Sequence, residues 1–134
     1  MRSQLLLWIA LLVVGTQANA QRVVEAGALP CSVDTGQVVV TPLYSDSLCS
    51  SFLICIPRSV PPHFHKEHTE HVVVLEGEAI MLLGDTSFAI SAGRTIIIPK
   101  GTAHAVRTTS AIPLRVISVQ SPRYDGTDRI LLER

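Results

Sequence analysis

Short aliphatic segments with a two-residue period constrain the fold of this chain more than any other feature of its sequence. They are rich in Val, Ile and Thr and are separated by Gly, Pro and Asp, a pattern typical of β-strands joined by tight turns. The segments expected to form strands are Gln37–Val40, Phe52–Ile56, Val72–Leu75, Ala79–Leu83, Phe88–Ile90, Thr95–Ile98, Ala103–Arg107 and Leu114–Val119. The one helix candidate is Asp128–Glu133, where Asp128 could cap a short turn. The pattern predicts an all-β domain whose sandwich or barrel removes exposed sheet edges.

The N-terminal residues have the three parts of a secretory signal peptide. Arg2 supplies a positive charge, Leu5–Val14 is an uninterrupted apolar run, and Ala18-Asn19-Ala20 has the small residues of a cleavage site. The apolar run has about half of the ~20 residues that a membrane-spanning helix needs, so we expect no stable membrane insertion. The sequence therefore predicts an exported protein, periplasmic or extracellular after cleavage near Ala20.

The rest of the chain is long enough for one domain. We expect an irregular N-terminal segment over 21–35, a β-barrel domain over 36–120 and a polar C-terminal tail over 121–134, after the signal peptide at 1–20. The sequence has 11 basic and 11 acidic residues. This balance argues against a nucleic-acid partner, which would favour a basic surplus.

Three cysteines, Cys31, Cys49 and Cys55, are expected in an oxidising compartment, where at most one internal disulfide can form among them. Cys49 and Cys55 flank one strand-like stretch, which favours a bond between Cys31 and one of the two. Three free buried thiols that behave as small apolar side chains remain the alternative.

Four histidines cluster within residues 63–71, a stretch that includes candidate metal-binding residues of the sequence. His63 and His65 are two residues apart and would project from the same face of a strand, while Phe64 points away. A turn separates them from Glu70, and His104 is the one histidine distant in sequence. Three imidazoles and one carboxylate suit a single divalent ion.

Two other histidines lie in the same stretch. His68 falls in the turn before Glu70, and we expect it to be solvated near the mouth of the barrel. His71 follows Glu70 directly, so we expect its side chain on the opposite, outer face.

The cluster falls within two motifs that resemble those of the cupins. The first motif is His63-x-His65, four residues, Glu70, six residues and Gly77, and the second is Gly93, five residues, Pro99-x-Gly101, two residues and His104. The 15 residues at 78–92 between them match the short spacing of compact bacterial cupins. The resemblance covers about 57–107. The sequence departs from the usual motifs at Pro57, where Gly is usual, and at Thr108, where Asn is usual.

The resemblance implies a single antiparallel jelly-roll β-barrel and one divalent transition metal, which is Mn, Fe, Ni, Cu or Zn in the family. The implied metal ligands are His63, His65, Glu70 and His104. Because cupins often pair through strand edges, the resemblance also implies a homodimer.

Such a site predicts a metalloenzyme of oxygenase-like or lyase-like type that acts on a small oxygenated molecule. Four protein ligands leave open positions on the ion, and Glu70 is also a candidate general base. Alternation places Val72 and Val74 on the Glu70 face and Val106 on the His104 face, so the expected pocket is aliphatic.

Three alternatives remain open. The first is a non-catalytic module that binds a small ligand through its metal, and the second is a metal-free structural cupin. The third is a sugar isomerase or carbohydrate-binding cupin, which the scarcity of aromatic residues disfavours because sugar sites commonly stack rings. The single Trp, Trp8, lies in the predicted signal peptide.

Overall fold

Ten β-strands and one short 3-10 helix make up the part of the chain that the computed structural model describes, residues 23–31 and 36–132. The elements are η1 (Ala26–Ala28), β1 (Val39–Ser45), β2 (Ser50–Ile56), β3 (Ser59–Phe64), β4 (Thr69–Glu76), β5 (Glu78–Leu83), β6 (Thr86–Ser91), β7 (Thr95–Ile98), β8 (His104–Thr108), β9 (Leu114–Ser121) and β10 (Ile130–Leu131). The predicted signal peptide lies outside the described residues. Within the described residues, no helix has the length and apolar character that crossing a membrane requires.

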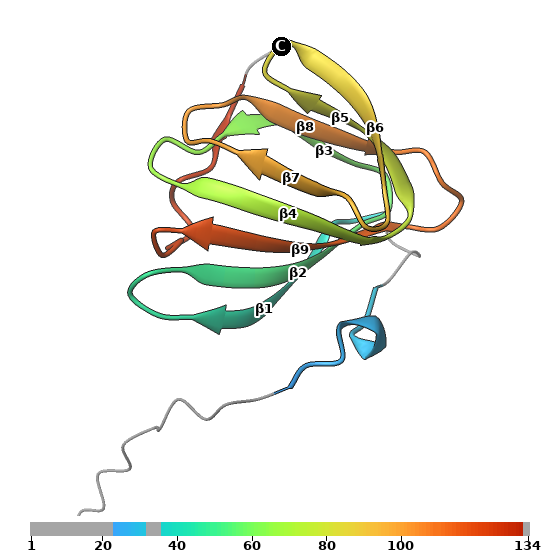
Figure 1. Ribbon diagram of the computed structural model, residues 1–134, viewed down its shortest axis with the longest axis horizontal. Coiled ribbons are helices and arrows are strands. Elements are labelled where there is room, and N and C mark those ends of the chain that lie inside the picture. Colours follow the sequence, from blue (N-terminus) through green and yellow to red (C-terminus); the bar gives the residue numbers. More distant parts are fainter. Residues whose placement is uncertain (1–22, 32–35, 133–134) are drawn as a thin grey trace, which may run out of the picture.

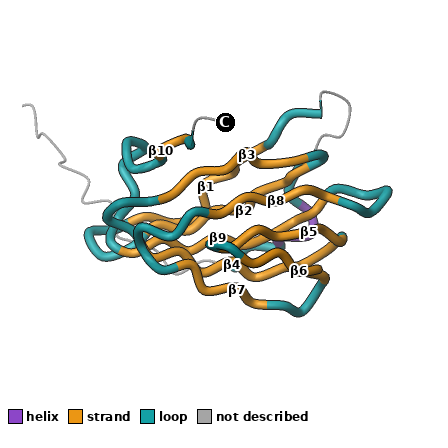
Figure 2. The backbone as a smooth tube through the Cα atoms, turned by 90° about the horizontal axis from the view of Figure 1, so that it is seen from above, coloured by secondary structure: helices purple, strands orange, loops and turns teal. Residues whose placement is uncertain are grey.

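The strands form two antiparallel sheets that pack against each other (Figure 1). One sheet has the order β1-β2-β9-β4-β7, and the other has the order β10-β3-β8-β5-β6. Figure 2 shows the stacked strands from above, with β10 beside β3 at the margin of its sheet. The prediction of an all-β jelly-roll barrel is confirmed.

Alternating side chains along β9 show how the barrel interior changes from apolar to polar. The inward positions are Leu114, Val116, Ser118 and Gln120, all of them buried. The first two belong to the aliphatic core, together with residues of both sheets. β4 has the same gradient in the opposite direction, because Glu70 faces inward ahead of the buried valines. One end of the barrel is therefore packed with hydrocarbon, and the other end presents polar groups.

Three elements differ from the strand pattern predicted from the sequence. β1 begins at Val39 and continues through Pro42, which an edge strand tolerates because one side of its backbone needs no partner. The sequence placed His63 and His65 on one strand, whereas β3 begins at Ser59, includes Pro61-Pro62, pairs irregularly with β8 at that point and ends before His65. The prediction of a helix from Asp128 is wrong, because Ile130–Leu131 forms β10 and pairs with His63 and Phe64.

A glycine is required where β4 turns into β5. Gly77 has a φ of +82°, which favours residues without a Cβ. A Cβ at this position would lie 2.6 Å from the carbonyl oxygen of Pro113. The close approach of this turn to the start of β9 explains the glycine at the end of the first motif.

The N-terminal segment is attached to the outside of the barrel by two kinds of contact. Cys31 forms a disulfide with Cys55 of β2, with 5.5 Å between their Cα atoms, and Cys49 is free. The guanidinium of Arg115 on β9 donates hydrogen bonds to the carbonyl groups of Ala26, Gly27 and Leu29. The disulfide agrees with the preference for Cys31 pairing with one of the other two cysteines.

The burial of Leu114 leads to a first prediction. Leu114 is 1% exposed in the core, whereas Leu48 is 72% exposed in a loop. We expect Leu114→Ala to lower the free energy of unfolding by about 2–5 kcal/mol, because it leaves a cavity among packed side chains. The same substitution at Leu48 should change it by less than about 0.5 kcal/mol. Urea denaturation measures both values, and equal losses would contradict the assigned core.

Candidate metal centre

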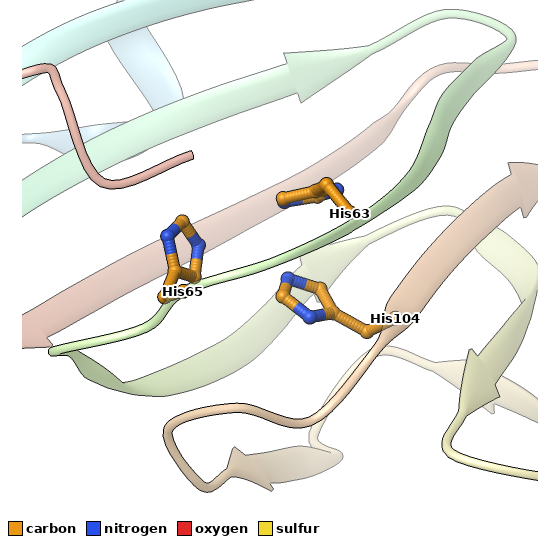
Figure 3. Close-up of side chains that lie close together, drawn as sticks. All are labelled: His63, His65 and His104. Atoms are coloured by element: carbon orange, nitrogen blue, oxygen red, sulfur yellow. The ribbon is translucent and has the colours of Figure 1, made fainter. Parts of the chain in front are cut away.

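Three histidines from two neighbouring strands meet inside the polar end of the barrel (Figure 3). His63 lies on β3, His65 follows that strand directly, and His104 begins β8 as the register partner of His63. All three side chains are buried, and one ring nitrogen of each lies within 4.8 Å of those of the other two. Two ligands on opposite sides of an ion are separated by about 4 Å, so the cluster could hold one metal ion.

Backbone carbonyl groups orient all three rings. Nδ1 of His63 lies 2.9 Å from the carbonyl oxygen of Pro61, and Nδ1 of His104 lies 3.0 Å from that of Thr102. Nδ1 of His65 contacts the carbonyl oxygen of Asp128. A carbonyl only accepts, so each Nδ1 carries a proton, and a ring that is neutral has its lone pair on Nε2. The three hydrogen bonds thus direct lone pairs toward a common centre, as in known metal sites.

The carboxylate of Glu70 lies beside the histidine cluster and comes from the opposite sheet. Its Oε2 lies 3.4 Å from Nε2 of His104 and 3.6 Å from Nε2 of His65. Its Oε1 accepts a hydrogen bond from the Ser118 hydroxyl and lies 3.5 Å from Nε2 of Gln120. Two groups on β9 therefore fix one carboxylate oxygen and leave the other facing the imidazoles.

The environment shifts the pKa values of these groups in different directions. Burial, together with the neighbouring His104, lowers the pKa of His63 to about 4. Burial alone would lower the pKa of His65, but the Glu70 carboxylate and the contact with Asp128 outweigh it and raise that pKa. Burial alone would raise the pKa of Glu70, but His104, His65 and the Ser118 hydrogen bond lower it well below its usual range. The carboxylate is therefore ionised beside imidazole nitrogens.

The donor atoms fit a divalent transition ion. Nε2 of His104 is buried 3.4 Å from Oε2 of Glu70 and makes no hydrogen bond of good geometry with any described residue. Acceptors that face each other in a dry site are unfavourable unless a cation or a proton lies between them. Imidazole nitrogen with one carboxylate is a donor set that suits first-row transition metals.

A cavity of about 640 Å³ extends from the cluster into the barrel. His63, His65, Glu70 and His104 lie at its polar end, and Gln120, Tyr124 and Arg129 also line it. Its other walls are largely aliphatic and include Val72, Met81, Ile90, Ile98, Val106 and Leu114. Val72 and Val106 line the cavity as alternation predicted, whereas Val74 lies in the core beyond it.

The C-terminal segment builds part of the site, which the prediction of a polar tail did not include. The carboxylate of Asp128 accepts hydrogen bonds from the backbone N–H groups of Lys66, Glu67 and His68. Its own carbonyl oxygen holds the ring of His65. Asp128 thus fixes both the turn after His65 and the orientation of His65 itself. The sequence marks Asp128 only as an acidic residue two positions after Gly126. No spacing rule connects it with the turn at 66–68, which lies about 60 positions earlier.

The prediction of a solvated His68 is wrong. Its side chain is buried, with Nδ1 against the Asp128 carboxylate and Nε2 2.9 Å from the carbonyl oxygen of Arg123. Both partners are hydrogen-bond acceptors, so the contacts of His68 place each ring nitrogen to donate and bring the ring within ion-pair distance of the Asp128 carboxylate. The ring of Tyr124 packs against His68 and His65. The C-terminal segment covers a residue that would otherwise lie at the surface, whereas His71 is exposed as expected.

Comparisons with known proteins agree with this architecture. The family model of the cupin domain matches residues 52–120, and the chain belongs to this family. An uncharacterized protein from Aquifex aeolicus is 36% identical over 84 residues, which are 63% of this chain and 69% of that protein.

Two further comparisons are more limited. Mannose-1-phosphate guanylyltransferase 2 from Escherichia coli O157:H7 is 37% identical over 70 residues, which are 52% of this chain and 14% of that enzyme. A crystal structure of a Bacillus halodurans protein has 18% identity and a TM-score of 0.68, covering 86% of this chain and 91% of that one. The structural likeness concerns the fold alone.

The contacts of Asp128 lead to a second prediction. We expect Asp128→Ala to speed amide hydrogen exchange at residues 66–68, because their N–H groups lose an acceptor, and to weaken metal affinity roughly tenfold through the loosened His65. Hydrogen exchange and metal titration measure the two effects. Asp125→Ala is the matched control, because the Asp125 carboxylate accepts its side-chain and backbone hydrogen bonds from Thr127 and none from the turn at 66–68 in the described part of the chain. Unchanged exchange in Asp128→Ala would show that this contact does not hold the turn.

Proposed function

We propose that this protein is a metal-dependent cupin that holds one divalent transition ion, Mn, Fe, Ni, Cu or Zn, through His63, His65, Glu70 and His104. The observation that carries the proposal is the meeting of three histidine ring nitrogens within 4.8 Å of one another, each ring oriented by a backbone carbonyl, with the ionised Glu70 carboxylate beside two of them. In this proposal the ion supplies Lewis acidity and open positions for an oxygen ligand. The residues of the chain hold the ion, orient the ligand and exclude water from the cavity.

We further propose an oxygenase-like or lyase-like activity on a small, partly apolar oxygenated molecule. The cavity supports this proposal, because its aliphatic walls would hold a hydrocarbon portion while its polar end is confined to the cluster. The lowered pKa of Glu70 favours its role as a ligand over that of a general base, since a base near neutral pH needs a higher pKa.

A non-catalytic binding module is the principal alternative, and oxygen consumption separates the two. An enzyme of the oxygenase type should consume oxygen with a suitable substrate when loaded with Fe(II), whereas a lyase should convert the substrate without oxygen. A module should bind the same molecule and release it unchanged.

A carbohydrate ligand is a second candidate. The similarity to mannose-1-phosphate guanylyltransferases favours it, but the aliphatic cavity walls offer few rings on which a sugar could stack. Calorimetric titration with mannose tests this candidate directly.

We also propose that the protein is exported. The Cys31–Cys55 disulfide supports this proposal, because disulfides persist in oxidising compartments. Fractionation of cells that produce the full chain tests it. The homodimer remains a prediction, which light scattering of the purified protein can test.

Metal content provides the third prediction and the main test. We expect the protein purified without chelators to contain about one equivalent of transition metal, and His104→Ala to lose most of it because a nitrogen ligand is removed. His71→Ala is the matched control, since this exposed histidine lies on β4 directly after Glu70. Elemental analysis gives the stoichiometry. A full equivalent of metal in His104→Ala would refute the assigned ligands.

The pH dependence of metal affinity provides the fourth prediction. The raised pKa of His65 means that this ring retains its proton at a higher pH than an ordinary histidine, and the ion must displace that proton. Apparent affinity should therefore fall as the pH is lowered from about 8 to about 6, within the range where histidines titrate. Metal titrations in a pH series measure this dependence, and a constant affinity would contradict it.

A further inference from the structure

A buried hydrogen-bond acceptor beside the cluster is not used by the proposed metal centre. Gln120 is 6% exposed, faces Glu70 as its register partner on β9, and lines the cavity. Its Nε2 is directed at Oε1 of Glu70, and its Oε1 has no hydrogen-bond partner among the described residues. Turning the amide over would place two acceptor oxygens against each other, because Glu70 is ionised. Oε1 of Gln120 is therefore an unpaired acceptor closed to solvent, and a donor group inside the cavity pairs with it after a small movement of the surrounding side chains.

A positive charge lies at the mouth of the same cavity. Arg129 lines the cavity just before β10 and forms no salt bridge with any described carboxylate. The nearby Asp128 carboxylate is already paired with His68 and the turn after His65. The charge of a divalent ion is larger than the single negative charge of Glu70. With the ion bound, the ion, Glu70 and Arg129 together would give the cavity a net positive charge. A ligand with one negative charge would neutralise part of this excess.

The aliphatic walls of the cavity place a third constraint on the ligand. Apart from the cluster and the residues at its mouth, the cavity is lined mainly by aliphatic side chains such as Val72, Met81 and Ile98. A ligand must therefore combine an apolar body, a hydrogen-bond donor and a negative charge. Its volume must fit about 640 Å³, within the range of sites for small molecules.

We propose that the cavity binds a small aliphatic hydroxy acid, with Gln120 as the acceptor for its hydroxyl group and Arg129 as the partner of its carboxylate. The inference rests on the proposed metal centre and specifies its ligand class. Gln120 and Arg129 are specificity-determining residues in this arrangement. A hydrocarbon without the hydroxyl leaves the Gln120 acceptor unpaired in a dry site, which disfavours its binding.

Three probe molecules of similar shape test the proposal. α-Hydroxyisovalerate has all three features, isovalerate lacks the hydroxyl, and α-hydroxyisovaleramide lacks the negative charge. Calorimetric titration into the Zn(II)-loaded full chain gives the three affinities. We expect the hydroxy acid to bind roughly tenfold or more tightly than either analogue, the ratio that one good polar contact provides.

Two variants test whether Gln120 determines the preference for the hydroxyl group and Arg129 the preference for the carboxylate. Gln120→Leu should reduce the affinity for the hydroxy acid to that for isovalerate. Its control is Ser121→Ala, because Ser121 follows Gln120 on β9, is exposed and lies outside the cavity lining. Arg129→Gln should weaken both acids roughly tenfold and leave the amide unchanged. Its control is Arg123→Gln, because Arg123 lies on the same segment outside the cavity lining.

The outcomes separate this inference from the proposed function. Equal affinities for all three probes, no binding of the hydroxy acid, or unchanged selectivity in both variants would overturn the ligand class. Elemental analysis of each sample shows whether one ion is present. A metal-loaded protein that fails these tests refutes the hydroxy acid alone, whereas a wild-type protein that retains no metal refutes the metal centre itself.

Discussion

Hydrogen bonds from imidazole Nδ1 atoms to backbone carbonyl groups are the interaction on which the site depends. The three carbonyls belong to Pro61 in β3, Thr102 just before β8 and Asp128 just before β10, so the fold determines which nitrogen of each ring faces an acceptor and carries a proton. Without these bonds a neutral ring could present either nitrogen. The barrel therefore supplies orientation as well as position, and the donor set is formed before any ligand arrives.

The site also depends on the change from apolar to polar side chains along the inward faces of β4 and β9. Leu114 and Val116 lie in the hydrocarbon core, while Ser118 and Gln120 on the same face of β9 contact Glu70. The packing of the core therefore also positions the polar end, because one strand, β9, contributes residues to the core and residues that contact Glu70. A carboxylate placed so close to buried hydrocarbon stays ionised through its hydrogen bonds and the adjacent imidazoles.

The sequence was sufficient to predict the barrel, because its strands follow a local pattern, and the residues that meet in the cluster, because three of them are close in sequence and His104 lies in the second of the two motifs. The two-residue period of β9 and the spacing of His63, His65 and Glu70 are such patterns. The strand that carries His63 was expected, but its start over 59–62 was not, because Pro61-Pro62 removes two backbone donors and the irregular pairing with β8 accommodates them. The roles of Asp128 and His68 depend on contacts across about 60 positions, for which a single sequence has no periodic signal.

The register of β4 has a consequence for assembly. Glu70 faces the cavity opposite Gln120, and the adjacent His71 faces outward opposite Val119. Since side chains alternate strictly, a slip of one position would exchange them and bring a fourth imidazole inside in place of the carboxylate. Such a misassembled molecule would have a different net charge at its centre and a different preference among ions. The identity of a captured ion would consequently report whether the strands had joined in their native alignment.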